Sequence, residues 1–171
     1  MEGTDLMTRI QTAALVTLRM VVGWHICYEG LAKLLDPYWS SAGYLASAQW
    51  WFRDLFIQLA ASPTAVTIID AVNAWGLTAI GLLLMVGTLS RAAAIAGMVL
   101  LALYYLAAPP FVGLRYAMPS EGSYLIVNKV MIELVALWVL CAFPTARVFG
   151  LDALLARRAG QPEAPPAPAQ A

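Results

Sequence analysis

The sequence predicts an all-α fold: a polytopic membrane bundle of four helices, with an interfacial helix in its first outward loop. Of the 171 residues, 61% are hydrophobic and only 12% are charged, which is too apolar for a soluble domain of this size. Four apolar stretches are also long enough to cross a bilayer. They cover about residues 10–35, 64–87, 92–108 and 123–143.

The predicted domain organisation has one membrane domain with short ends. Residues 1–9 form a polar N-terminus, residues 10–155 the four-helix domain, and residues 156–171 a Pro/Ala-rich tail. A tail of that composition is expected to be disordered.

The first apolar stretch carries a row of ionisable side chains. At about 100° per residue, His25, Glu29 and Lys33 follow one another along one helical face, and Arg19 falls on the same side. An ionisable side chain at membrane depth faces protein, water or a partner charge. The row is therefore predicted to line the inside of the bundle and to belong to a functional site.

A loop rich in aromatic residues follows Asp36-Pro37, where proline ends the first helix. Trp51, Leu55 and Leu59 share one face of a predicted helix over 47–60. Because Trp and Tyr prefer the membrane interface, this helix is predicted to lie along the membrane surface. A packed loop helix without a function is the alternative interpretation.

The second and third apolar stretches differ in polarity. The second contains Asp70 and Asn73, and its face continues through small residues to Gly81, a surface suited to close helix packing. The third has no ionisable residue and is interpreted as mainly structural. It ends at Pro109-Pro110.

The fourth apolar stretch carries Asn128, Lys129 and Glu133. In an antiparallel bundle Glu133 lies roughly 5 Å in depth from Arg19, a gap that a long guanidinium side chain can bridge. We therefore predict a structural ion pair between Arg19 and Glu133.

Basic residues outside the stretches predict the orientation. One side holds Arg9, Arg91, Arg147, Arg157 and Arg158, against Arg53 and Arg115 on the other. Since cytoplasmic segments carry the excess of Lys and Arg, both termini are predicted to be cytoplasmic. The aromatic loop and the Pro-Pro-Phe loop then face outward together.

This orientation brings polar groups from three helices into one predicted outward-facing pocket. Carboxylates and an imidazole can exchange protons, and the predicted catalytic residues of this kind are His25, Glu29 and Asp70. The predicted cofactor-binding donors are Lys33, Asn73, Asn128 and Lys129. The alternative is that these groups form interhelical salt bridges that only fix the helix pairing.

Several chemistries find no support in the sequence. Cys27 and Cys141 form neither a C-x-x-C motif nor metal-ligand spacing, so no metal site is predicted. The single histidine excludes a bis-histidine haem within one protomer. The charge is balanced and forms no basic face, so nucleic acid is not expected as a partner.

Several short motifs resemble the DoxX/DoxD-like membrane proteins. They are Arg19-x3-Gly23-x6-Gly30-x2-Lys33-Leu34 in the first stretch, Gly81 to Gly87 with Arg91-Ala92, Tyr104-Tyr105-Leu106-Ala107, and Gly150-Leu151-Asp152. The resemblance implies a four-helix bundle in a prokaryotic plasma membrane. The family includes the membrane subunit of thiosulfate:quinone oxidoreductase, so the resemblance also implies electron transfer to quinone together with a separate redox subunit.

The expected function is thus that of an integral membrane subunit of a redox system, with quinone in the outward pocket and a redox partner protein as the electron donor. Whether the chain is itself an enzyme is left open, as is a homo-oligomer. One alternative is a non-enzymatic assembly or anchor module in contact with membrane lipids. A proton or small-solute pathway is the least favoured alternative.

Overall fold

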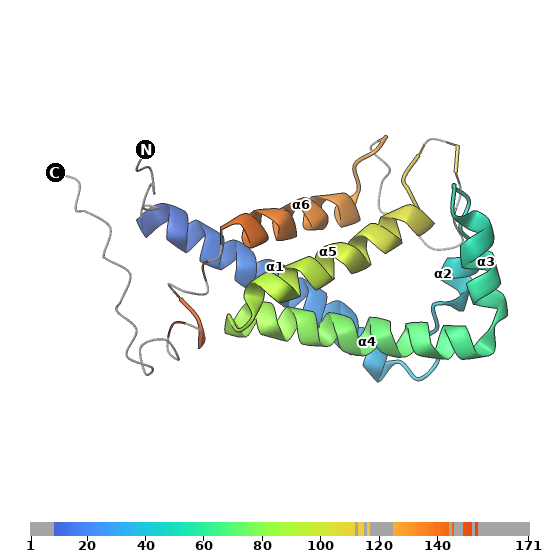
Figure 1. Cartoon of the computed structure of the whole chain (residues 1–171), viewed down its shortest axis with the longest axis horizontal. Helices are drawn as coiled ribbons and strands as arrows, with labels where there is room; N and C mark the ends of the chain where they lie inside the picture. Colours follow the sequence, from blue (N-terminus) through green and yellow to red (C-terminus); the bar gives the residue numbers. More distant parts are fainter. Residues whose placement is uncertain are drawn as a thin grey trace.

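The computed structural model describes residues 9–111, 113, 114, 116, 125–143, 145, 149–151 and 153. These residues contain six α-helices and no β-strand (Figure 1). The all-α prediction is therefore confirmed for the described part of the chain. The polar segment 1–8 and the predicted disordered tail 156–171 lie outside the described residues.

Three helices are long and apolar enough to cross a membrane. They are α1 (Arg9–Leu35), α4 (Pro63–Val86) and α5 (Ser90–Ala107), and each agrees with a predicted span to within about two residues. Local signals explain their ends. The Ser62 side chain accepts a hydrogen bond from the Ala65 N–H at the start of α4, and Gly87 ends α4 with a φ of 72°.

The fourth predicted span is shorter than expected. Helix α6 (Lys129–Ala142) has 14 residues, whereas the prediction began at residue 123; residues 123 and 124 lie outside the described residues. The helix begins late because Asn128 caps it, with its Oδ1 accepting the Met131 N–H at 2.9 Å. Fourteen residues extend about 21 Å, less than the roughly 30 Å of a hydrocarbon core.

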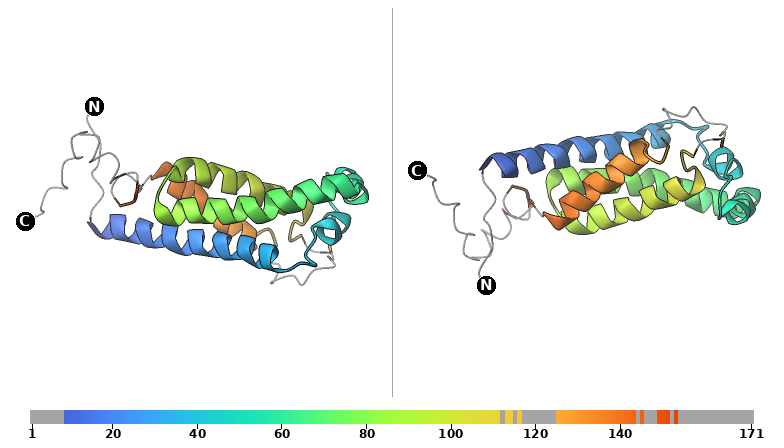
Figure 2. Two further views of the ribbon diagram at one scale, coloured as in Figure 1. Left: turned by 90° about the horizontal axis from the view of Figure 1, so that it is seen from below. Right: turned by 90° about the horizontal axis from the view of Figure 1, so that it is seen from above.

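The four longer helices pack around a common core (Figures 1 and 2). Helix α1 lies against α4, α4 against α5, α5 against α6, and α6 against α1. The core that they share consists of Val22, Ile26, Leu77, Ile80, Leu84, Ala93, Ala94, Leu101, Leu137 and Leu140. Its members are all aliphatic, so shape and close contact hold the helices together.

Helices α1 and α4 make the closest approach. A Cβ added at Gly81 would overlap the backbone of Cys27 and the carbonyl oxygen of Gly23, and one added at Gly30 would overlap Thr78. The predicted small-residue packing face of α4 is therefore confirmed. The two helix backbones come this close only because glycine has no side chain.

Helices α2 (Ala42–Ala46) and α3 (Arg53–Ala61) lie across one end of the four-helix core (Figure 2). The prediction started the loop helix at 47, but Trp50 and Trp51 form a turn and stack at 4.5 Å, so α3 begins at Arg53. Phe56 is its buried residue, whereas Trp51 is 82% exposed. A position of α3 along a membrane surface stays a prediction.

The outer faces of the four longer helices are apolar. Their exposed side chains include Val21, Trp24, Tyr28, Ile68, Val72, Trp75, Ile95, Val99, Leu103, Ile132, Val135 and Trp138. A soluble monomer rarely exposes so continuous an apolar surface. Together with the three long apolar helices, this surface is that of a membrane protein.

Candidate functional site

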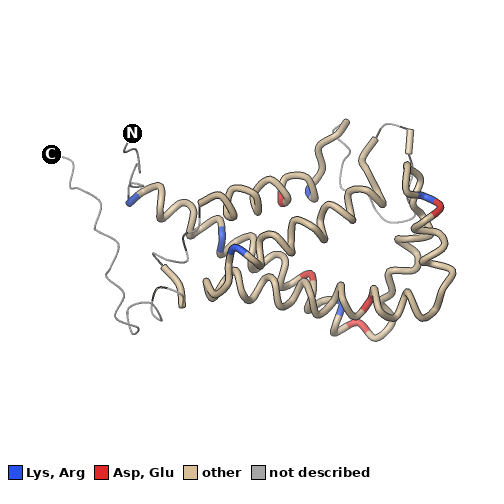
Figure 3. Tube along the Cα trace, viewed as in Figure 1, with Lys and Arg blue, Asp and Glu red and all other residues tan. Residues whose placement is uncertain are grey.

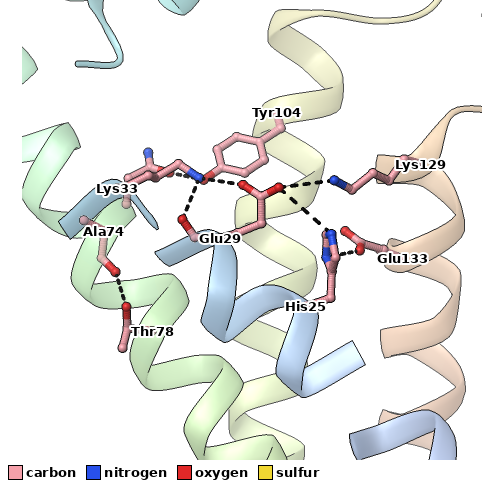
Figure 4. Close-up of polar contacts among 9 residues, drawn as sticks. His25, Glu29, Lys33, Ala74, Thr78, Tyr104, Lys129 and Glu133 are labelled. Carbon is pink, nitrogen blue, oxygen red and sulfur yellow. Dashed lines mark hydrogen bonds and ion pairs between the residues drawn. The ribbon is translucent and has the colours of Figure 1, made fainter. Parts of the chain in front are cut away.

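Charged residues are few along the chain, and α6 carries both an acidic and a basic position (Figure 3). Five ionisable side chains meet where α6 approaches the C-terminal half of α1 (Figure 4). We call them the α1–α6 cluster: His25, Glu29, Lys33, Lys129 and Glu133. Three come from α1 and two from α6, and each helix presents its members at four-residue steps. The predicted charged face of the first helix therefore does meet charged residues of another helix.

Glu29 is the centre of the α1–α6 cluster. Its Oε2 accepts a hydrogen bond from Lys33 Nζ at 3.0 Å, and its Oε1 accepts one from Lys129 Nζ at 3.2 Å. Lys33 Nζ also donates to the backbone carbonyl of Glu29 at 3.3 Å. One carboxylate thus links two ammonium groups from two helices (Figure 4).

His25 lies between the two carboxylates of the cluster. Its Nδ1 is 2.5 Å from Glu133 Oε1, and its Nε2 is 4.0 Å from Glu29 Oε1. The short contact to Glu133 is at ion-pair distance, but its geometry is not that of a well-aligned hydrogen bond. With a neutral imidazole, the two carboxylates and two ammonium groups balance in charge.

The cluster is accessible on one side. The side chains of Glu29, Lys129 and His25 are 43%, 39% and 36% exposed, whereas those of Lys33 and Glu133 are 14% and 16% exposed. Part of the cluster therefore anchors the two helices, and part faces outward, where another molecule could reach it.

Tyr104 extends the polar region to α5 and α4. Its hydroxyl donates to Asn73 Oδ1, and its backbone carbonyl accepts a hydrogen bond from the Tyr44 hydroxyl at 2.7 Å. Figure 4 shows the Tyr104 ring beside Lys33 and Glu29. Burial raises the pKa of the Tyr44 phenol, which keeps it a hydrogen-bond donor. Sequence analysis missed this role of Tyr104, although a hydroxyl in an apolar span was a signal for it.

Asp70 and Asn128 have backbone partners outside the cluster. Asp70 Oδ1 accepts the Ser41 N–H at 2.8 Å, next to the start of α2, and Asn128 Oδ1 caps α6. The structure therefore gives both residues a local structural role and places neither in hydrogen-bond contact with Glu29. Their predicted roles in catalysis and cofactor binding stay predictions.

Asp70→Ala is expected to lower the free energy of unfolding by about 1–2 kcal/mol, because the Ser41 N–H loses a charged acceptor in a partly buried place. Thermal or denaturant unfolding in detergent measures the change. Asp54→Ala is the matched control, since Asp54 is 86% exposed. An Asp70 variant as stable as the control would show that this hydrogen bond does not hold α2.

Arg19 lies nearer the other end of α1 and is 2% exposed. Its Nη1 donates to Thr145 Oγ1 at 3.2 Å, and its Nη2 donates to the Phe149 carbonyl at 2.6 Å. These contacts link Thr145 and Phe149, which follow α6, to α1. They do not include Glu133, whose close contact is with His25, and the predicted Arg19–Glu133 ion pair stays a prediction.

Aromatic residues of both loops gather at the α2–α3 end. Trp50 packs edge-on against Phe111 at 5.0 Å between ring centroids, so the aromatic loop and the Pro-Pro-Phe loop meet there. Lys33 Nζ lies 5.5 Å from the centre of the Trp39 ring, a cation–π distance. Aromatic side chains thus adjoin the Lys33 side of the cluster.

The chemistry open to these groups is proton exchange and hydrogen bonding. Within the described ranges, no three His, Cys, Asp or Glu side chains form a group that could hold a metal ion. A comparison with protein-family models, curated proteins and solved structures found no match to the chain. The resemblance to the DoxX/DoxD-like proteins therefore rests on the sequence motifs alone.

Proposed function

We propose that the chain is an integral membrane subunit of a quinone-linked redox system, with the quinone head group at the α1–α6 cluster. The observation that carries the proposal is the partial exposure of Glu29, His25 and Lys129 on an otherwise apolar protein. Charged groups kept at membrane depth and left reachable are a functional-site signal.

The residues present fit a quinone. Its two carbonyl oxygens need hydrogen-bond donors, which Lys129 and Lys33 supply, and its apolar tail needs an apolar path. Trp24, Tyr28 and Ile132 are exposed and directly precede the cluster residues His25, Glu29 and Glu133 in the sequence. An amphipathic molecule in the bilayer would therefore meet polar donors and apolar flanks at the same place.

When bound, a quinone supplies an acceptor for two electrons and two protons. The residues of this chain would bind the head group, hold its orientation and exchange the protons. Glu29 and His25 are the groups with the chemistry for proton exchange, and the two lysines balance the charge of Glu29. The electrons would come from a partner redox protein.

We further propose that α6 completes a four-span bundle of the DoxX/DoxD type in a prokaryotic plasma membrane. Helix α6 packs against α5 and α1, and Ile132, Val135 and Trp138 on its outer face are exposed apolar residues, as on the three longer helices. The excess of arginine at the end that holds Arg9 and Arg91 supports cytoplasmic termini.

The proposed orientation predicts which positions react with an impermeant thiol reagent in intact cells. In a variant without the two native cysteines, Ser40→Cys should be labelled, because Ser40 is exposed at the α2–α3 end. Gln161→Cys, in the tail outside the described residues, should be protected. Labelling of Gln161→Cys together with protection of Ser40→Cys would place the α1–α6 cluster nearer the cytoplasmic face.

The alternative function is a non-enzymatic assembly or anchor module. Three of the predicted site residues, Asp70, Asn73 and Asn128, favour it. Each has a hydrogen-bond partner within the protein, so none of them needs a ligand to explain its polar side chain. In that case the α1–α6 cluster would also serve only to pair the helices.

Glu29→Gln and Lys129→Met separate the two functions. If the cluster binds quinone, each variant should weaken the binding of a short-chain ubiquinone about tenfold or more. Lys129→Met removes a charged donor to a carbonyl oxygen, and Glu29→Gln neutralises the carboxylate that holds both ammonium groups in place. Quinone titration, followed by tryptophan fluorescence, and thermal unfolding are measured on the same preparations. Asp36→Asn is the control, because it removes a negative charge directly after the last residue of α1, outside the α1–α6 cluster.

The structural alternative makes the opposite forecast. Both variants would then change thermal stability and leave the quinone affinity at the value of the Asp36→Asn control. Unchanged affinity in well-folded Glu29→Gln and Lys129→Met proteins would reject the cluster as the quinone site.

A further inference from the structure

Glu133 and Glu29 approach opposite nitrogens of the same imidazole, and their surroundings differ. Glu133 Oε1 lies 2.5 Å from Nδ1 of His25, while Glu29 Oε1 lies 4.0 Å from Nε2. The side chain of Glu133 is 16% exposed and that of Glu29 is 43% exposed. The Nδ1 side of the ring is therefore the inner side, and the Nε2 side faces the accessible part of the cluster.

The short contact constrains where a proton lies. An unprotonated Nδ1 presents a lone pair, and a carboxylate oxygen presents only lone pairs. Two such acceptors 2.5 Å apart repel each other strongly, so the contact disfavours an unprotonated Nδ1 beside a Glu133 carboxylate, even though a ring N–H there is not well aligned with Oε1. A proton on Nδ1 also lets Glu133 remain a carboxylate, which balances the charges of Lys33 and Lys129 together with Glu29.

We propose that Glu133 is a positioning residue that holds His25 in the Nδ1–H tautomer and thereby leaves Nε2 as the proton acceptor on the accessible side. This role differs from the ion pair with Arg19 predicted from the sequence. It deepens the proposed function, on which its catalytic meaning rests: Nε2 and Glu29 together form the proton-exchanging face toward a ligand. The preference for this tautomer rests on the short contact between Nδ1 and Glu133 and on the charges of the cluster, and it needs no bound ligand.

The chain offers a direct test because it contains one histidine. Protein labelled with ¹⁵N-histidine and placed in lipid bilayers gives NMR signals from one imidazole, and ring nitrogens with and without a proton resonate far apart. At the alkaline end of a pH series, where the ring is neutral, Nδ1 should carry the proton. A neutral ring with its proton on Nε2 and none on Nδ1 would overturn the inference.

Two variants show whether Glu133 is the cause. Glu133→Gln should reduce the Nδ1–H population, because the amide can also donate to an unprotonated Nδ1. Glu29→Gln is the matched control on the other nitrogen and should leave Nδ1 protonated. Equal Nδ1–H populations in wild type and a folded Glu133→Gln protein would reject Glu133 as the positioning residue.

The result of the NMR test can be distinguished from the result of the quinone-binding test. The NMR measurement needs no quinone and no turnover, so a protein that binds no quinone can still show the Nδ1–H tautomer. Conversely, quinone binding by a protein whose neutral His25 carries its proton on Nε2 would support the proposed function and reject this inference.

Discussion

Gly81→Leu is expected to prevent α1 and α4 from packing, and Gly81→Ala to lower the free energy of unfolding by about 3 kcal/mol or more. The reason is the absence of space. A Cβ at position 81 would overlap the backbone of Cys27 and the carbonyl of Gly23, and backbone atoms cannot turn aside as a flexible side chain can. Unfolding in detergent, followed by circular dichroism, measures the loss.

Gly76→Ala is the matched control on the same helix. A Cβ there would lie 3.8 Å from Leu100 Cδ1, an ordinary van der Waals distance. Since alanine favours a helix over glycine, this variant should be as stable as wild type or slightly more so. Equal stability of the Gly81→Ala and Gly76→Ala variants would show that α1 and α4 do not approach each other as closely at Gly81 as the structure has them.

Arg19→Met is expected to cost several kcal/mol. The variant removes two charge-assisted hydrogen bonds, to Thr145 Oγ1 and to the Phe149 carbonyl, in a place where Arg19 is 2% exposed. Arg53→Met is the control, because Arg53 pairs with Asp54 at an exposed surface. Protease cleavage after α6 should also become faster in Arg19→Met alone, since its contacts hold that segment.

The predicted Arg19–Glu133 pair can be tested in the same series. If the two groups interact, Glu133→Ala in the Arg19→Met background should cost less than it costs in wild type. If the two costs add, Glu133 acts through His25 and not through Arg19.

The sequence predicted the long helices well because their signals are local. Pro37, Pro63 and Gly87 act on the backbone beside them, and a long apolar run can only be buried or face lipid. The start of α6 was misplaced because the side chain of Asn128 caps the helix. The predicted start of this helix rested on the apolar composition of the stretch, which does not show where such a local hydrogen bond forms.

The α1–α6 cluster was predictable in part. Four-residue spacing placed His25, Glu29 and Lys33 on one face of α1, and the structure confirms that face. The partners across helices were not predictable, because they depend on the axial offset of α6 against α1. A shift of one turn is about 5.4 Å, enough to decide which side chain of α1 lies next to Glu133, and the structure places His25 Nδ1 2.5 Å from it.

Equilibrium binding by the purified wild-type protein tests the central claim most directly. In lipid nanodiscs, decylubiquinone is titrated beside decylbenzene, which carries the same apolar tail on a ring without carbonyl oxygens. The quinone site at Glu29 and Lys129 predicts saturable binding of decylubiquinone at one site per chain and no saturable binding of decylbenzene. Equal behaviour of the two compounds, or no binding of either, would contradict it.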